Sequence, residues 1–85
     1  MMTAEQALDF VGCVWRLQKD GRARRAELWS QDARTIEVRY TVNNRLDERL
    51  TFEGPEAGDR ALAAVETEAH RLRSSGWMDR RFLLD

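Results

Sequence analysis

The sequence contains a single cysteine and no long apolar run among its 85 residues. Because Cys13 has no second cysteine to pair with, no disulfide can form within the chain, and nothing indicates an oxidising compartment. No apolar stretch approaches the roughly 20 residues that a membrane-spanning helix needs. Residues 1–6 also lack the basic segment and apolar run of a signal peptide. We therefore expect a cytoplasmic protein with no membrane partner.

An excess of one charge is also missing. The chain has 14 basic and 15 acidic side chains, a formal net charge of −1. This balance gives neither a global attraction to nucleic acid nor a strong field of the opposite sign. Lys19 is the only lysine. The skew toward arginine suits bidentate and stacked contacts, but a GC-rich genome produces the same skew, and we favour that explanation.

The composition is that of one ordered domain. At 85 residues the chain has room for one modest core and not for two. The hydrophobic fraction of 42% and the three tryptophans argue against disorder, although the charged fraction of 34% is high. We treat residues 1–85 as a single domain, with a tail over about 78–85 that is mobile or docks a partner.

Local patterns predict a short helix followed by four strands. Thr3 and Gln6 have the spacing of a capping box, which predicts a helix from about Ala4 to Phe10. Apolar residues then alternate with polar ones over 13–17, 24–30, 35–42 and 46–53, the pattern of half-buried strands. Asp20-Gly21 and Asn43-Asn44 are hairpin turns, since these residues accept positive φ. The expected inward residues are Cys13, Trp15, Leu17, Ala26, Leu28, Ile36, Val38, Tyr40, Val42, Leu46, Glu48, Leu50 and Phe52.

A long helix is predicted from about Ala57 to Ser75. Gly76 stands where a left-handed cap belongs, and Leu72 and Trp77 then form the apolar contact of a Schellman motif. The apolar stripe of this helix is Leu62, Val65, Ala69 and Leu72, thickened by Ala61 and Ala64. We predict one core formed by Leu62, Val65, Leu72, Ile36, Val38, Tyr40 and Leu50.

Together these elements predict an α+β fold. Sequential hairpins need only short connections, so the strands form a four-stranded antiparallel meander. The long C-terminal helix packs on one face, and the short helix precedes the sheet. This order is similar to that of transcription-coactivator and whirly-type single-strand-binding domains at the level of fold alone, which implies no function.

No motif in the chain predicts catalysis. Glu66, His70 and Ser74 share one helix face and are the residue types of an activated nucleophile. That spacing arises easily by chance on a charged helix, and no glycine-rich turn supplies an oxyanion hole. One cysteine and one histidine match no zinc spacing, and the scattered glycines form no phosphate-binding pattern. We expect neither enzymatic activity nor a cofactor or metal.

The outward face of the sheet is the first candidate interaction surface. Arginines around an aromatic ring are typical of single-strand nucleic-acid binders, and this face is expected to carry Trp29, Arg16, Arg25, Arg39 and Arg49. The same face carries Glu27, Glu37, Asp47 and Glu53. Mixed charges form cross-strand pairs, and on net charge we favour a solvated, self-paired face. A bulge would instead turn Trp29 into the core.

The edges of the sheet are the second candidate. The last strand is defended by the inward Glu48 and by neighbouring charges, whereas the first strand, with Trp15, has no comparable protection. Its cover is the N-terminal helix, the tail Phe82, Leu83 and Leu84, or a second chain. The sequence thus favours a non-enzymatic protein-interaction module that self-associates, with an unknown partner. The alternatives are a single-stranded nucleic-acid-binding domain and a small inhibitor of a larger host complex.

Overall fold

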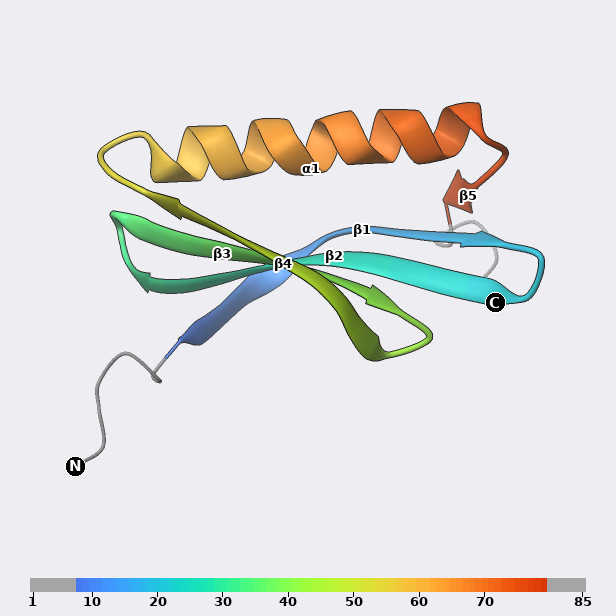
Figure 1. The fold of residues 1–85 in the computed structure, drawn as a ribbon, viewed down its shortest axis with the longest axis horizontal. Coiled ribbons are helices and arrows are strands. Elements are labelled where there is room, and N and C mark those ends of the chain that lie inside the picture. Colours follow the sequence, from blue (N-terminus) through green and yellow to red (C-terminus); the bar gives the residue numbers. More distant parts are fainter. Residues whose placement is uncertain (1–7, 80–85) are drawn as a thin grey trace.

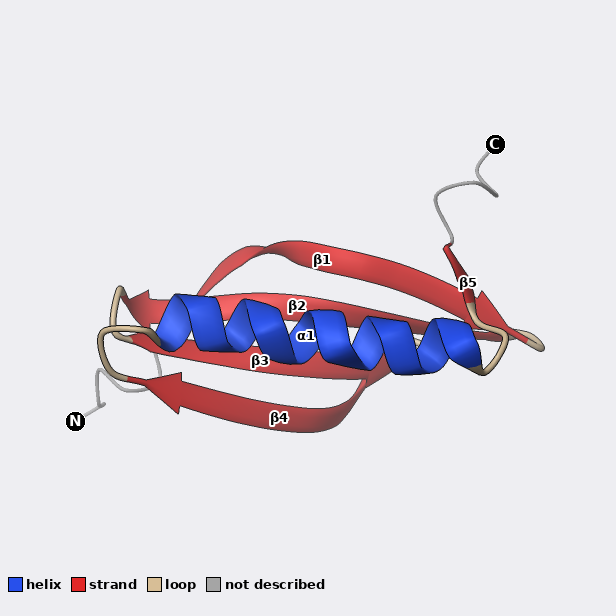
Figure 2. Ribbon diagram, turned by 90° about the horizontal axis from the view of Figure 1, so that it is seen from above, coloured by secondary structure: helices blue, strands red, loops and turns tan. Residues whose placement is uncertain are grey.

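The computed structural model of the chain describes residues 8–79. The elements in chain order are β1 (Asp9–Lys19), β2 (Arg22–Asp32), β3 (Thr35–Val42), β4 (Arg45–Glu53), α1 (Ala57–Ser74) and β5 (Met78–Asp79). They form one antiparallel sheet in the order β4-β3-β2-β1-β5, with α1 lying across one face (Figure 1). Viewed from above, α1 runs along the length of the sheet over β2 and β3 (Figure 2). The α+β class, the four-stranded meander and the long C-terminal helix are confirmed.

Both predicted hairpin turns are present, and their backbone explains their sequences. Asp20 and Gly21 have φ values of 53° and 79°, and Asn43 and Asn44 have values of 51° and 70°. Two successive positive φ angles match the twist of a two-residue hairpin. The Asn43 side chain also accepts a hydrogen bond of 2.9 Å from the backbone N–H of Ala23, which ties the β3–β4 turn to β2.

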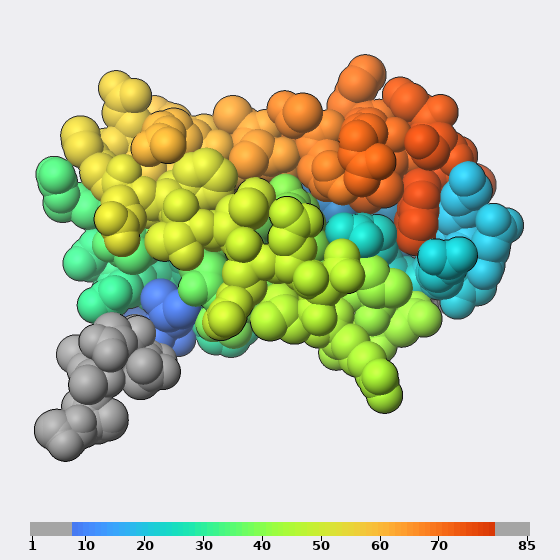
Figure 3. Space-filling view, viewed as in Figure 1, coloured from blue at the N-terminus to red at the C-terminus, as the bar shows by residue number. Residues whose placement is uncertain are grey.

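The core lies between α1 and the face of the sheet that it covers. Its sheet side is formed by Trp15, Leu17, Ala26, Val38 and Tyr40, and its helix side by Ala61, Val65, Ala69 and Leu72. Small side chains every fourth residue let α1 approach the strands closely. Figure 3 shows the side chains of α1 lying along the sheet, with those of β4 on the viewed side. The Trp15 indole N–H donates a buried hydrogen bond of 2.8 Å to the carbonyl of Val65.

Two predicted core residues lie elsewhere. Leu62 is 44% exposed, because the face of α1 toward the sheet runs through Ala57, Ala61 and Val65, one residue away. Leu46 is also exposed, because the β3–β4 register shifts between Tyr40 and Thr41 and pairs Leu46 with Thr41. The prediction of Leu62 in the core is wrong, and so is that of Leu46 on the inward face; in both cases the position that faces α1 or the sheet differs from the predicted one by a single residue.

Strand β1 departs most from its prediction. It begins at Asp9, so the last two residues of the predicted N-terminal helix are strand, and the rest of that helix lies outside the described residues. The β1–β2 register shifts around Val11 and again around Val14. These bulges pair Cys13 with Glu27 on the face away from α1, and the prediction of an inward Cys13 is therefore wrong.

The end of α1 returns the chain to β1. Trp77 donates its backbone N–H to Leu72 O and Gly76 donates to Arg73 O, both at 3.1 Å, which is the predicted Schellman motif. Strand β5 then pairs with β1 at Leu17 and Gln18 and adds a fifth strand that the sequence did not predict. Among residues 8–79, no helix has the length and apolar character needed to cross a membrane.

Candidate functional site

The face of the sheet away from α1, called here the open face, carries the arginines singled out by sequence. Strand register brings its side chains into three cross-strand rows. The rows are Phe10–Trp29–Glu37–Thr51, Cys13–Glu27–Arg39–Arg49 and Arg16–Arg25–Thr41–Leu46. All four arginines and Trp29 therefore share one surface, while Asp47 pairs with Arg24 at 3.4 Å.

The centre of the open face is a self-paired cluster, the Trp29 network, formed by Arg25, Glu27, Trp29, Glu37 and Arg39. The guanidinium of Arg39 lies 4.2 Å from the centroid of the Trp29 ring and is ion-paired with Glu37. One Glu27 oxygen accepts the Trp29 indole N–H at 3.0 Å, and the other binds Arg25 at 2.8 Å. Trp29 is thus held by Glu27 and Arg39 on the open face, and it does not enter the core.

This network limits what the open face can bind. A cation already occupies the position over the Trp29 ring that a stacking base would need. Phe10 approaches the same ring edge-on, with centroids 5.4 Å apart. Both carboxylates of the network have nearly buried side chains and are used by arginines. The polar groups at the centre of the open face are therefore already paired, mostly with residues two positions away on the same strand, and Arg39 joins β3 to β2 over the Trp29 ring.

Two arginines on the open face remain outside the ion pairs. Within residues 8–79, neither Arg16 nor Arg49 lies within ion-pair distance of a carboxylate. Arg16 stands directly across from Arg25, and Arg49 across from Arg39. Like charges directly opposite on a sheet repel each other. Positive charge is therefore in excess on either side of the Trp29 network.

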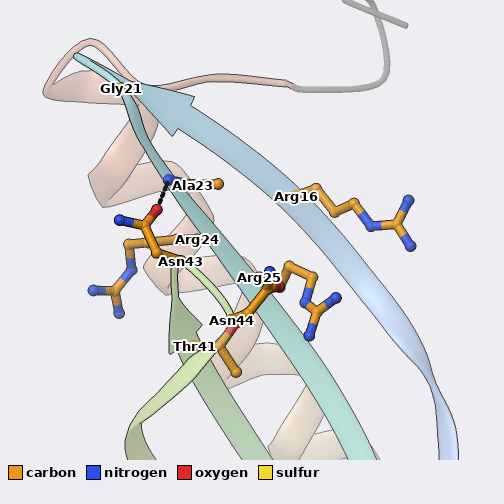
Figure 4. A pocket seen from close by; sticks show the side chains of 8 residues that line it. All are labelled: Arg16, Gly21, Ala23, Arg24, Arg25, Thr41, Asn43 and Asn44. Atoms are coloured by element: carbon orange, nitrogen blue, oxygen red, sulfur yellow. Dashed lines mark hydrogen bonds between the residues drawn. The ribbon is translucent and has the colours of Figure 1, made fainter.

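A hollow of about 530 Å³ opens at the end of the sheet that carries the two hairpin turns. It is lined by Arg16, Gly21, Ala23, Arg24, Arg25, Thr41, Asn43 and Asn44 (Figure 4). Thr41 is only 7% exposed, and among residues 8–79 its hydroxyl has no hydrogen-bond partner. Within the same part of the chain the buried Nε atoms of Arg24 and Arg25 have none either. Sequence reasoning missed this site, because Thr41 looks like an ordinary outward residue of an alternating strand.

A second hollow, of about 510 Å³, lies between β4 and α1. Tyr40 lines it together with Glu48 and Glu68. Burial raises the pKa of Tyr40, and the charges of Glu68 and Glu48 raise it further, while Arg24 opposes them. The hydrogen bond from Arg71 lowers the pKa of Glu68. The phenol therefore stays protonated and the Glu68 carboxylate stays charged. The two groups line the hollow without exchanging a proton near neutral pH.

Strand β1 carries three exposed apolar side chains, Phe10, Val11 and Val14, called here the β1 patch. These side chains are 54%, 59% and 36% exposed. Among the described residues, the only strand on that side of β1 is β5, which pairs with Leu17 and Gln18. The sequence signal for this patch was the nearly unbroken apolar run from Phe10 to Trp15, which exceeds what one strand face can bury.

Other candidates from the sequence fall away from these surfaces. Trp15, proposed as an edge contact, is 7% exposed and packs in the core against Tyr40. Phe82, Leu83 and Leu84 lie outside the described residues. On α1, the Ser74 hydroxyl donates to the backbone carbonyl of His70 at 2.9 Å and so does not address the imidazole. Within residues 8–79, no three His, Cys, Asp or Glu side chains gather as a metal site.

Comparison with known proteins assigns no family. The chain matches no protein-family model, no curated protein and no solved structure. Its function must therefore be inferred from the open face, the hollow beside Thr41 and the β1 patch.

Proposed function

We propose that this chain is a non-enzymatic protein-interaction module that self-associates through the β1 patch. The observation that carries the proposal is the coincidence of three exposed apolar side chains with an edge of β1 that pairs with no strand of residues 8–79 over positions 10–14. Phe10, Val11 and Val14 project from β1 where, among residues 8–79, no strand lies on its outer side. Apolar side chains beside free backbone donors and acceptors favour contact with another chain.

The opposite edge of the sheet supports the choice of β1. Strand β4 forms that edge, and its exposed side chains include Arg45, Asp47, Glu48, Arg49 and Glu53. Charged residues on an edge strand discourage pairing with a second sheet. The two edges of the sheet thus differ in character over residues 8–79, and apolar side chains favour cover on the β1 side.

The bulges at Val11 and Val14 define the kind of contact. A bulge interrupts the regular spacing of donors and acceptors, so a long continuous strand pairing across this edge is unfavourable. Side-chain packing of the β1 patch against the same patch of a second copy avoids that difficulty and gives a two-fold contact. The net charge of −1 produces little repulsion between copies.

The alternatives use the same surfaces differently. A single-stranded nucleic acid on the open face would have to displace Arg39 from the Trp29 ring and from Glu37. A small inhibitor of a larger complex would place its target, instead of a second copy, on the β1 patch. Self-association needs no displacement of an existing contact, and for that reason we favour it.

Light scattering coupled to gel filtration tests the proposal. We expect the full chain to elute as a dimer and Val11→Lys to elute as a monomer, because an ammonium group cannot be buried in an apolar contact. Leu62→Lys is the matched control, since it places the same charge on an exposed leucine of α1. A monomeric parent chain, or equal dissociation of both variants, would contradict the proposal.

A shortened chain that ends at Asp79 separates the patch from the tail. If the β1 patch is the interface, this chain remains a dimer. Loss of the dimer on shortening, with Val11→Lys still dimeric, would instead assign the contact to residues 80–85. Circular dichroism on each variant checks that the fold is retained.

A further inference from the structure

The hollow beside Thr41 combines three features that point to a missing ligand. Arg16 on β1, Arg25 on β2 and Thr41 on β3 are register partners in one cross-strand row. Figure 4 shows Arg16 and Arg25 projecting to the same side, with Thr41 and Asn44 beside Arg25. Because neighbouring strands lie about 4.8 Å apart, a small ligand over this row would meet all three side chains.

The polar atoms of this row are not satisfied within the described part of the chain. The Thr41 hydroxyl is buried with no hydrogen-bond partner, and so is the Nε of Arg25. Buried polar groups in proteins nearly always have partners, and the exceptions call for an explanation such as a bound ion. The guanidinium N–H can only donate and the hydroxyl can donate as well as accept, so an acceptor is the group that satisfies both.

The charges of the row point the same way. Glu27 is the carboxylate bound to Arg25, and both of its oxygens are already used, one by Arg25 and one by Trp29. Arg16 faces Arg25 with no carboxylate of residues 8–79 within ion-pair distance. An anion between the two guanidinium groups removes their repulsion and supplies the missing acceptors.

Arg24 lines the hollow without belonging to this row. It follows the opposite face of β2, where its guanidinium pairs with Asp47 and lies 5.9 Å from the Tyr40 ring centroid. Figure 4 shows its side chain pointing away from Arg25. The site is therefore a two-arginine site completed by the Thr41 hydroxyl.

We propose that this row binds the phosphate group of a small phosphorylated molecule. Guanidinium groups match a phosphate with paired hydrogen bonds, and a phosphomonoester brings about two negative charges and three acceptor oxygens. The hollow of about 530 Å³ holds more than a phosphate, so a polar carrier fits beside it. Among residues 8–79 no aromatic side chain lines the hollow, which favours a sugar-like or polyol carrier over a stacked base. This proposal does not rest on self-association.

Titrations followed by nuclear magnetic resonance test it on the full chain. The probes are inorganic phosphate and glycerol 3-phosphate, with glycerol and sodium chloride at matched ionic strength as controls. We expect saturable shifts at Arg16, Arg25 and Thr41 with both phosphates and none with the controls. Equal shifts with chloride, or shifts spread over all basic residues, would overturn the proposal.

Three substitutions sharpen the test. Arg16→Gln should weaken phosphate binding by about tenfold or more, the loss of one charged hydrogen-bonding partner. Arg49→Gln is the matched control, because it removes an arginine without an ion pair from the next row, and it should leave the affinity unchanged. If both substitutions weakened phosphate binding equally, the cause would be general surface charge, and the proposed site would be wrong.

Thr41→Val separates a binding role from a structural one. It keeps the shape of the side chain and removes only the hydroxyl. Because that hydroxyl has no partner within residues 8–79, Thr41→Val should leave the melting temperature unchanged or raise it, and still weaken phosphate binding several-fold. A drop in melting temperature with unchanged affinity would contradict the proposal. A single-stranded oligonucleotide that binds the same row and is not displaced by glycerol 3-phosphate would also overturn it.

Discussion

The two faces of this sheet are built from the same strands and have opposite chemistry. Leu17 and its neighbour Arg16 illustrate the difference, since one is fully buried under α1 and the other is exposed on the open face. Because successive side chains on a strand point to opposite faces, each strand contributes to both. The covered face consists of side chains that pack by shape, whereas the open face consists of charges that pair.

The comparison indicates that the covered face supplies most of the stability, whereas the open face contributes little to it and is available for binding. Burial of apolar side chains such as Leu17, Val38 and Val65 supplies the main favourable term for a domain of this size. Ion pairs at the surface such as those of the Trp29 network, whose arginine side chains stay partly exposed, contribute only about 0–1 kcal/mol each. Substitutions on the open face should therefore alter binding without unfolding the protein.

The largest expected effect comes from Leu17→Ala. The side chain is completely buried, so its truncation loses transfer free energy and leaves a cavity, which costs about 2–5 kcal/mol. Arg16→Ala, one residue away on the open face, should change stability by no more than about 0.5 kcal/mol. Urea unfolding of both variants measures the difference. Similar midpoints for the two would show that the faces are not energetically distinct.

Much of the fold follows from local sequence signals. Period-two alternation located all four long strands, and residues with low cost at positive φ located both hairpins. The spacing of Leu72, Gly76 and Trp77 predicted a Schellman motif at the end of α1, and both hydrogen bonds of that motif are present. These features depend on neighbours in the chain, and for that reason the sequence alone was sufficient.

The rest depends on contacts between distant segments. The bulges at Val11 and Val14 are set by pairing with β2, and they turned Cys13 to the open face. The shift beside Tyr40 turned Leu46 outward in the same way. Leu62 was misplaced because alanines, which carry little weight in a hydrophobic pattern, decide how closely α1 approaches the sheet. The Thr41 site is a product of three strands and has no local signature.

Gly76→Ala should have an intermediate effect. Gly76 has a φ of 100°, which a residue with a Cβ adopts only with strain, and the expected loss is about 1–2 kcal/mol. Added bulk is not the cause, because a Cβ there would only touch the Lys19 side chain at 3.5 Å. Gly58→Ala in α1 is the control, with open space around it and no positive φ, and it should be neutral or stabilising. Thermal unfolding of both variants measures the difference. Equal melting temperatures for Gly76→Ala and Gly58→Ala would contradict the role of the cap.

The smallest expected effect is a shift in the titration of Tyr40, which lies on the covered face where it meets the β4 edge. Burial raises its pKa above the ordinary value of 10.0, and the charges of Glu68 and Glu48 add to the rise while Arg24 opposes it. Tyr40 is the only tyrosine, so absorbance at alkaline pH reports on this residue alone. We expect the phenol of the folded protein to ionise at higher pH than that of the chain unfolded in denaturant.

The sign of the accompanying stability change follows from proton binding. Between the two pKa values the unfolded chain has lost the Tyr40 proton and the folded chain still holds it. The contribution of Tyr40 to stability is therefore complete below the unfolded pKa and declines as the pH rises through the folded pKa. Glu48→Gln should lower the folded pKa and Arg24→Gln should raise it, because they remove charges of opposite sign near one phenol. Movement of the pKa in the same direction in both variants, or identical titration of folded and unfolded chains, would show that Tyr40 is not set in the covered face as described.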